Sequence, residues 1–272
     1  MINKYNFIFV ILVYRNSEDL IMCLKSIKEH VSDYKVIIVN SYYDDLSKNS
    51  IEQIAVENKC DFLNVSNNGY GAGNNRGIEF AVENYSFDYL IVSNPDIEIL
   101  KFPRSIQSIE GGDIIAPQII ARDGKNQNPI LVIDNPIADY FMNYGFKRNI
   151  KAFVLIGFAL NKLPRELFLL FCRGKAKKVY GAHGSFVIFS RRAIDVLTSN
   201  PYDEKIFLFV EEFVISRLAK IKGLKTIYNP SICIKHNEDG SIELANISEE
   251  TYMKKSTLYY FENYRKKANF ER

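Results

Sequence analysis

The chain has 272 residues, 47% of them hydrophobic and 25% charged, and its formal net charge is +3 at pH 7. This length allows one large α/β domain or two small ones. The net charge is too small to predict a nucleic-acid partner from bulk electrostatics. The four cysteines are far apart and form no CxxC pair. They speak against a disulfide framework or a zinc site and favour a cytoplasmic protein with reduced thiols.

The apolar run Phe7–Val13 predicts a buried first strand. It does not fit the core of a signal peptide, because it is short, lacks a small-residue cleavage site and is followed at once by Tyr14-Arg15-Asn16. Ser17 is a good helix N-cap, and apolar residues then recur at helical spacing over 20–27. No stretch of the sequence reaches the roughly 18 apolar residues that a membrane-spanning helix needs.

Strands and helices alternate along the next part of the chain. Strands are predicted at Val36–Val39 and Asp61–Val65, with a helix at Ile51–Asn58 between them. This β-α-β-α-β order predicts a parallel sheet with right-handed crossovers. The glycine-rich loop that follows, Gly69–Gly77, is predicted to lead into a helix at Ile78–Glu83. It does not match the Rossmann spacing, but its N–H groups can approach a phosphate or a sugar.

The stretch Tyr89–Val92 predicts a further buried strand, which ends in Asn94-Pro95-Asp96 because Pro95 cannot donate a ladder hydrogen bond. Polar residues at this position lie where open α/β sheets bind ligands. Asp96 is a hard oxygen ligand of the kind that holds a divalent cation. The alternative is that these three residues form only a turn.

The second half is predicted to contain further strands, two short helices, a turn at Asn229-Pro230 and a helical tail. The strands are Asp113–Pro117, Ile119–Ile120, Phe186–Phe189, Thr226–Tyr228 and Ile232–Ile234, and the helices are 191–195, 213–221 and Glu249–Lys267. The tail is rich in Tyr and Lys, and we expect it to pack on the core or to pair with a second subunit as a homodimer.

Residues 136–178 differ from the rest, because aromatic and aliphatic side chains are interleaved with lysine and arginine. Such helices can lie in a membrane interface against anionic lipid. They can equally form a helical hairpin packed on the sheet with a solvated basic face. Both alternatives stay open at this point.

Four polar segments follow predicted strands, and in a parallel sheet such segments gather at one edge. They are Asn40–Asp45, Gly69–Gly77, Asn94–Asp96 and Glu211-Glu212. Taken singly, His236 is a common structural histidine and Glu211-Glu212 a common match to a helix dipole. The order of these segments along the chain is a stronger indication of a functional site than any one of them alone.

Seven segments in this order resemble the family 2 glycosyltransferases, which are inverting enzymes of the GT-A fold, and in particular the rhamnosyltransferase-like branch of bacterial capsule and cell-surface polysaccharide synthesis. The segments are VYRNSEDLIMCLKSI, VIIVNSYYDD, NNGYGAGNNRGIEFA, YLIVSNPDIEI, GAHGSFVIFSRRAID, YDEKIFLFVEEFVISRLAKIKG and YNPSICIKHN. They cover most of 7–118 and 179–236 and leave 120–178 without a counterpart.

The resemblance implies a site residue by residue. Asp96 corresponds to the second acid of the family's Asp-x-Asp motif, whose first acid is here Asn94, and it would bind Mg²⁺ or Mn²⁺ with His236. Glu211-Glu212 matches the Glu-Asp pair whose second member is the catalytic base, although the extra methylene of Glu212 leaves Glu211 as the alternative base. The implied nucleotide-sugar-binding residues are Tyr14, Asn16, Asn40, Asp44, Gly71, Gly73, Asn74, Arg76 and Asn94. Asn40 stands where the family usually has a base-reading Asp.

The resemblance also implies a single GT-A domain, α/β with a mostly parallel central sheet flanked by helices. We expect a nucleotide-sugar-binding half at 1–118, a helical insertion at 119–178, an acceptor half at 179–248 and a C-terminal helix at 249–272. The implied reaction moves rhamnose or a hexose from a dTDP- or UDP-sugar to a saccharide or lipid-linked oligosaccharide. The enzyme would be cytoplasmic, with peripheral membrane contact through the insertion. The alternatives are a nucleotidyltransferase and an inactive sugar-nucleotide-binding or scaffold subunit.

Overall fold

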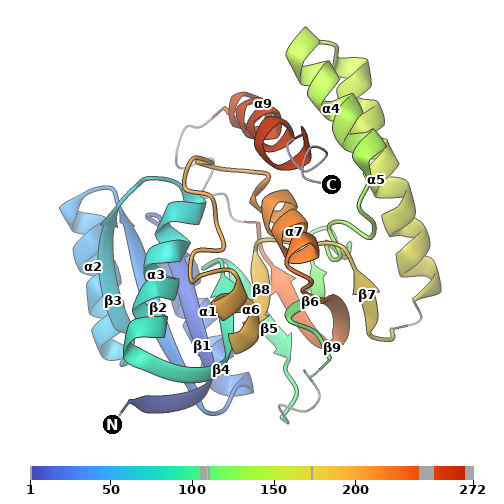
Figure 1. Ribbon diagram of the computed structural model, residues 1–272. Coiled ribbons are helices and arrows are strands. Elements are labelled where there is room, and N and C mark those ends of the chain that lie inside the picture. Colours follow the sequence, from blue (N-terminus) through green and yellow to red (C-terminus); the bar gives the residue numbers. More distant parts are fainter. Residues whose placement is uncertain (1, 105–108, 110, 173, 239–247, 267–272) are drawn as a thin grey trace.

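Figure 1 shows a computed structural model of the protein, which describes residues 2–104, 109, 111–172, 174–238 and 248–266. One sheet runs through the molecule with helices on both faces, as the sequence predicted. Its strand order is β3-β2-β1-β4-β8-β6-β9-β5, and β7 pairs with β9. The strands are β1 (Asn3–Val13), β2 (Tyr34–Tyr42), β3 (Asp61–Ser66), β4 (Tyr85–Ser93), β5 (Ile97–Lys101), β6 (Ile114–Ile120), β7 (Lys177–Val179), β8 (Phe186–Ser190) and β9 (Thr226–His236).

The first half of the sheet is parallel throughout. β1 lies between β2 and β4, β2 also pairs with β3, and each pairing is parallel. Both faces of β1 are covered: Phe9 and Ile11 pack in one core cluster, and Ile8 and Val10 pack in another on the opposite face. This burial explains why the strand reads as a continuous apolar run instead of an alternating one.

Helices cover the two faces of this half. α1 (Ser17–His30) and α2 (Asp45–Glu57) contribute to one core cluster, and α3 (Tyr70–Asn84) contributes to the other. α2 begins six residues before the predicted start at Ile51, because Asp44 caps it by accepting a hydrogen bond from the Ser47 N–H at 2.8 Å.

α3 begins at Tyr70, so the prediction of a glycine-rich loop up to Gly77 was wrong. The glycines serve close packing between this helix and the sheet. A Cβ on Gly73 would lie 2.5 Å from Leu12 Cδ1, and a Cβ on Gly77 would lie 2.3 Å from Val10 Cγ1. Tertiary packing therefore overrides the low helix propensity of glycine here.

The second half of the sheet contains both parallel and antiparallel strand pairs. The predicted parallel arrangement therefore holds for the first half only. β8 is antiparallel to both β4 and β6, while β6 and β9 are parallel. β9 continues through Asn229-Pro230, where a turn was predicted. The β6–β9 register shifts between Pro117 and Gln118, which pair with Asn229 and Cys233. The shift leaves Pro230 out of the pairing, so β9 continues past this proline.

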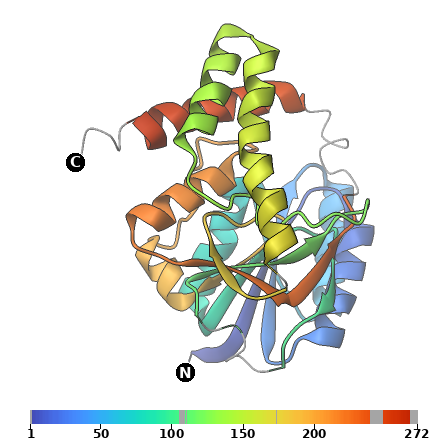
Figure 2. The ribbon, with the colours of Figure 1, turned by 90° about the vertical axis from the view of Figure 1, so that its right-hand side faces the viewer.

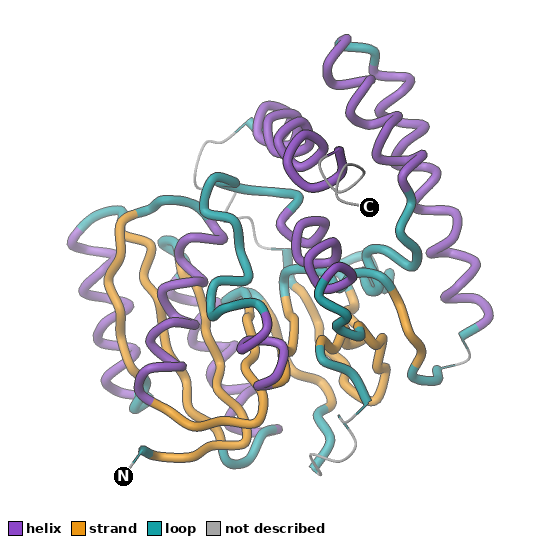
Figure 3. The backbone as a smooth tube through the Cα atoms, in the orientation of Figure 1, coloured by secondary structure: helices purple, strands orange, loops and turns teal. Residues whose placement is uncertain are grey.

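The remaining helices are α4 (Pro136–Arg148), α5 (Lys151–Phe171), α6 (Arg191–Val196), α7 (Glu211–Ile221) and α9 (Glu249–Tyr260), which continues as the π-helix η2 (Phe261–Lys266). Figures 1 and 2 show α4 and α5 side by side as a hairpin that projects away from the sheet, with α9 crossing near it. The tube in Figure 3 traces the loop that joins β6 to α4 and the one that leads into α7. The predicted tail helix is confirmed up to Lys266; Lys267 lies outside the described residues.

The tail packs on the core rather than standing free. Tyr260 is buried against Val210 and Val214, and Arg265 forms ion pairs with Asp134 and Asp139. Across the described ranges, every helix is too short or too polar to cross a membrane.

Candidate active site

A pocket of about 460 Å³ opens at the sheet edge where β1 and β4 end. β1 connects through α1 to β2 on one side, while β4 lies on its other side, so this is the switch point at which open α/β sheets bind ligands. The pocket is lined by Leu12, Tyr14, Ser41, Asn67, Gly69, Tyr70, Asn94, Pro95, Gln127, His183, Gly184, Ser185, Phe207, Leu208, Phe209, Glu211, Glu212, His236 and Glu238. We call it the switch-point pocket.

Asp96 and His236 meet beside this pocket. Ile97, the first residue of β5, pairs with His236, the last residue of β9, so Asp96 is held next to the histidine. Asp96 Oδ2 lies 3.4 Å from His236 Nε2, and both residues are less than 10% exposed. The other oxygen, Asp96 Oδ1, is buried without a hydrogen-bond partner in the described part of the chain.

A hydrogen bond to Gln127 orients the His236 ring. Gln127 Nε2 donates to the Glu238 carboxylate at 2.7 Å, so Gln127 Oε1 faces His236 Nδ1 at 2.8 Å. An amide oxygen only accepts, so Nδ1 carries the proton. Nε2 is the ring nitrogen that faces Asp96, and a hydrogen bond of this kind at Nδ1 orients histidines that bind a metal ion through Nε2.

These two side chains fit a divalent cation. An orphaned carboxylate oxygen and an imidazole lone pair supply two ligands, and phosphate oxygens and water can complete the shell around Mg²⁺ or Mn²⁺. No group of three His, Cys, Asp or Glu residues suited to a metal occurs among the residues that the structure describes. Of the described residues, Asp96 and His236 are the two that would hold such a cation.

Glu211 and Glu212 form the first turn of α7 and line the same pocket as His236. The two residues before them, Phe209 and Val210, have φ angles of 67° and 74°. This left-handed conformation is costly for a β-branched residue, and such strain gathers at functional sites. It directs the start of α7, and with it both carboxylates, into the pocket.

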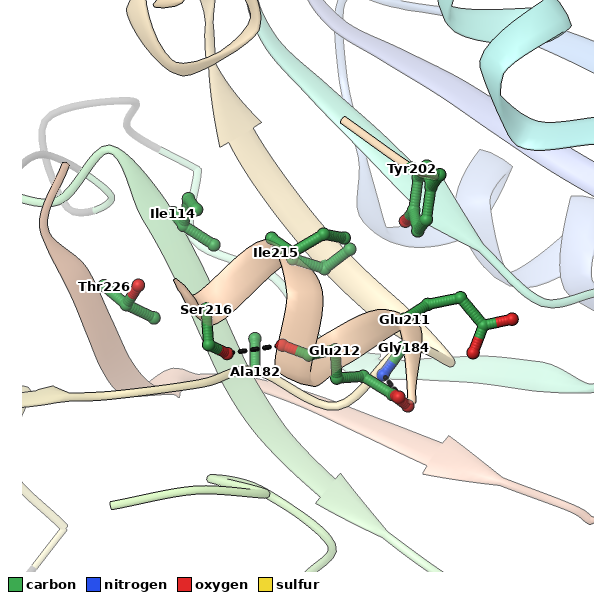
Figure 4. A pocket seen from close by; sticks show the side chains of 10 residues that line it. Ile114, Ala182, Gly184, Tyr202, Glu211, Glu212, Ile215, Ser216 and Thr226 are labelled. Carbon is green, nitrogen blue, oxygen red and sulfur yellow. Dashed lines mark hydrogen bonds between the residues drawn. The ribbon is translucent and has the colours of Figure 1, made fainter. Parts of the chain in front are cut away.

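The two carboxylates differ in their partners (Figure 4). Glu212 Oε1 accepts a hydrogen bond from the Gly184 N–H at 3.2 Å. Glu211 is 5% exposed, and its Oε1 has no partner among the described residues. Burial, followed by the charge of Glu212, raises the pKa of Glu211 well above its usual value. Burial also raises the pKa of Glu212, although hydrogen bonds from backbone N–H groups oppose it.

Two residues of the site that sequence reasoning did not single out are His183 and Tyr70. The Tyr70 hydroxyl donates to the Gly184 carbonyl at 2.8 Å, so Gly184 is held by Tyr70 at its carbonyl and by Glu212 at its N–H. Burial, with His236 and Arg165 nearby, lowers the pKa of His183 to about 3, so its ring is neutral near pH 7. The only sequence signal for His183 was its place in GAHGSFVIFSRRAID, directly before a strand.

Five of the predicted site residues line the switch-point pocket: Tyr14, Asn94, Glu211, Glu212 and His236. It places the other predicted nucleotide-sugar-binding residues outside the lining; they are Asn16, Asn40, Asp44, Gly71, Gly73, Asn74 and Arg76.

These outlying residues have structural partners. Asn16 caps α1, and the Asn40 side chain donates to Asn64 at 2.7 Å in the neighbouring strand. The Asn74 amide donates to the Tyr70 carbonyl at 3.0 Å, and Arg76 pairs with Glu79 and Glu204. Their predicted role in donor binding stays a prediction.

Residues 8–197 match the family described as Glycosyl transferase family 2. The chain belongs to glycosyl transferase family 2. It is also 25% identical over 210 residues to the "Low-salt glycan biosynthesis hexosyltransferase Agl10" of Haloferax volcanii, a match that covers 75% of this chain and 58% of that protein. The chain thus spans little more than half the length of this relative.

Solved glycosyltransferase structures share the fold. The structure of GalNAc-T7 with UDP, GalNAc and Mn²⁺ matches with a TM-score of 0.58 at 13% identity, over 86% of this chain and 44% of that one. The structure of TarS from S. aureus matches with a TM-score of 0.54 at 9% identity, over 96% and 44%. The chain therefore combines a GT-A-like fold with membership of a glycosyl transferase family, which disfavours the nucleotidyltransferase alternative.

Proposed function

We propose that this glycosyltransferase is metal-dependent and inverting, and that it moves rhamnose or a hexose from a dTDP- or UDP-sugar to a surface-polysaccharide acceptor. One observation carries the proposal: His236, whose Nε2 lies 3.4 Å from Asp96 Oδ2, and Glu212 both line the switch-point pocket. A group for the donor diphosphate and a carboxylate for the acceptor hydroxyl thus face one cavity.

The donor would lie with its diphosphate toward Asp96 and His236. These two residues would hold Mg²⁺ or Mn²⁺, which stabilises negative charge on a departing diphosphate. Tyr14 and Asn94, which line the switch-point pocket beside β1 and β4, would contact the nucleoside and the phosphates. The GalNAc-T7 structure was solved with UDP and Mn²⁺, and this supports a nucleoside diphosphate bound with a cation.

Glu212 would act as the general base. Its carboxylate would take the proton from the acceptor hydroxyl as the hydroxyl oxygen bonds to the anomeric carbon. The bond from that carbon to the diphosphate oxygen breaks, and the diphosphate leaves with the bonding electrons. Attack and departure on opposite faces invert the configuration of the anomeric carbon. The Gly184 N–H and the start of α7 orient the carboxylate for this role.

The identity of the sugar and of the acceptor rests on separate grounds. The rhamnosyl and capsule assignments come from the sequence resemblance. The name of the relative Agl10, a hexosyltransferase of glycan biosynthesis, supports a hexose donor and a glycan acceptor.

The acceptor would be lipid-linked and reached at a membrane surface. Of the 21 residues of α5 only Gly157 is buried, although the helix is rich in apolar side chains. Leu155 and Leu170 are 67% and 71% exposed, and Lys151 is exposed on the same helix. An exposed apolar helix with basic residues fits the interface of an anionic membrane.

Binding measurements test this function. Calorimetry with nucleoside diphosphates and nucleotide sugars, each with Mn²⁺ or Mg²⁺, should find one base that binds only with metal. Asp96→Ala should abolish that binding, and Asp88→Ala, which removes an exposed carboxylate from β4, should leave it unchanged. Binding that ignores both the metal and Asp96 would reject the proposal. A protein that binds and never transfers sugar would instead be the inactive subunit.

A further inference from the structure

A second pocket, of about 400 Å³, adjoins the switch-point pocket and shares His183, Phe209 and Glu212 with it. It lies between the α4–α5 hairpin, the start of α7 and the α9–η2 tail. Its lining is Ile130, Leu131, Asp139, Met142, Phe158, Asn161, Lys162, Arg165, His183, Phe209, Val210, Glu212, Phe213, Met253, Thr257, Tyr260 and Phe261. We call it the hairpin pocket.

The hairpin pocket is apolar except for a small charged part. Phe158, Lys162 and Arg165 follow helical spacing, so one face of α5 presents an aromatic ring and two cations to the same cavity. The carboxylates that line it are Glu212, at the shared wall, and Asp139, which is paired with Arg265.

The two cations are incompletely neutralised. Lys162 has no carboxylate partner in the described ranges of the chain. Arg165 makes a 3.4 Å ion pair with the exposed Glu166 and a long 3.3 Å hydrogen bond to the Asn126 carbonyl. Its Nε is buried and has no partner among the described residues. A buried guanidinium nitrogen without an acceptor is costly, so the Arg165 guanidinium is incompletely hydrogen-bonded within the described residues.

We propose that the hairpin pocket binds the anionic end of the acceptor, a phosphate ester carried on an apolar prenyl-type chain, with Lys162 and Arg165 at the phosphate. This inference rests on the proposed function, because it takes Glu212 as the base that both substrates must reach. Glu212 lines both pockets, so a donor in the switch-point pocket would leave the hairpin pocket as the adjoining cavity from which an acceptor hydroxyl reaches this carboxylate.

The chemistry of the lining selects this class of ligand. Guanidinium and ammonium groups together favour phosphate oxygens. The surrounding Phe158, Met142 and Met253 side chains disfavour a purely hydrophilic ligand and accept an unbranched or prenyl chain. A neutral saccharide alone would leave the positive charges of Lys162 and Arg165 without a counter-charge.

Calorimetric titration with farnesyl diphosphate tests the site. The titration is run in EDTA without nucleotide, so that no metal-bound donor site takes up the diphosphate. Farnesol carries the apolar chain alone, and inorganic pyrophosphate carries the charge alone. We expect farnesyl diphosphate to bind at least about 10-fold more tightly than either, as charged hydrogen bonds to two cations imply.

The variant pair decides where binding occurs. Lys162→Ala/Arg165→Ala should weaken farnesyl diphosphate about 10-fold or more. Lys147→Ala/Lys151→Ala removes the same charge from exposed positions of the same hairpin and should change the affinity less than about 3-fold, as expected for a screened surface charge. Equal losses in the two variants, or equal affinity for farnesol and farnesyl diphosphate, would overturn the proposal.

Nucleotide binding separates this inference from the function on which it rests. Lys162→Ala/Arg165→Ala should bind the nucleoside diphosphate and metal as the wild type does, because neither residue lines the switch-point pocket. A wild type that binds nucleotide with metal and shows no preference for farnesyl diphosphate refutes only the hairpin site. A wild type that binds no nucleotide refutes the proposed function itself.

Discussion

The Gly184 N–H donates a hydrogen bond to Glu212 Oε1 at 3.2 Å, and a Cβ built on Gly184 would lie 2.9 Å from the same oxygen. The glycine therefore both holds the carboxylate and leaves it room. The Tyr70 hydroxyl also donates to the Gly184 carbonyl, so Gly184 is held at both its N–H and its carbonyl.

Gly184→Ala should displace the Glu212 carboxylate and lower kcat about 100-fold, since small misplacements of a reacting group are costly. Overpacking should also lower stability by about 1–3 kcal/mol. A double-mutant cycle checks the cause by thermal unfolding: in the Glu212→Ala background, Gly184→Ala should cost much less, because the clashing atoms are gone. An unchanged stability cost in that background would point to a clash elsewhere.

Glu212→Gln should lower kcat by about 100- to 10 000-fold with little change in donor affinity, because the amide cannot accept the hydroxyl proton. Glu211→Gln should retain far more activity if Glu212 is the base. Stopped-time assays of both variants with the donor identified by calorimetry make the comparison. The opposite order of activities would make Glu211 the base and Glu212 its neighbour.

The acid limb of the pH–rate profile should lie above 4.5, the usual pKa of a glutamate, because burial raises the pKa of Glu212 and the base must be deprotonated. kcat/KM should therefore rise with pH through this limb. The apparent pKa belongs to the Glu211–Glu212 pair, since the two groups interact. The charge of Glu212 raises the pKa of Glu211 and not the reverse, so Glu211→Gln should leave the limb nearly in place, which a profile of that variant measures.

Glu211→Gln should also stabilise the fold, because it removes the cost of a buried charge with no partner at Oε1. A folded-state pKa above the unfolded value means that stability is full below the unfolded pKa, near 4.5, and falls as the pH rises toward the folded pKa. The variant should thus match the wild type at acid pH and exceed it by about 0.5–2 kcal/mol at pH 8. Thermal melts at the two pH values provide the measurement. A gain of equal size at both would mean that charge burial is not its source.

The apolar runs and polar strand ends predicted the sheet edge correctly, because burial on both faces of β1 and β4 leaves a clear local signal. Asp96 and His236 are 140 positions apart, and their contact depends on the antiparallel β5–β9 pairing, which no local pattern encodes. The early start of α3 escaped prediction because Gly73 and Gly77 are selected by contact with Leu12 and Val10 and not by helix propensity. The hairpin pocket could not be predicted from the sequence, because its walls come from segments far apart in the chain.

The tail is tied to the hairpin through Arg265, whose guanidinium contacts Asp134 and Asp139 in a buried cluster with Tyr260. Asp134 also pairs with Arg217 and Lys220 of α7, so this cluster joins the helix that carries Glu211 and Glu212 to the walls of the hairpin pocket. Burial raises the pKa of Asp139 even with Arg265 in place.

Arg265→Met should therefore destabilise the fold by about 3–5 kcal/mol at pH 8, because it leaves Asp139 buried and uncompensated. The loss should shrink toward pH 5, where protonation of Asp139 removes the unpaired charge. Lys48→Met, which breaks a partly exposed pair with Glu52 in α2, should cost less than about 0.5 kcal/mol at either pH. Thermal or urea unfolding of the three proteins at both pH values tests this. A pH-independent loss for Arg265→Met would show that packing of the arginine, and not its charge, anchors the tail.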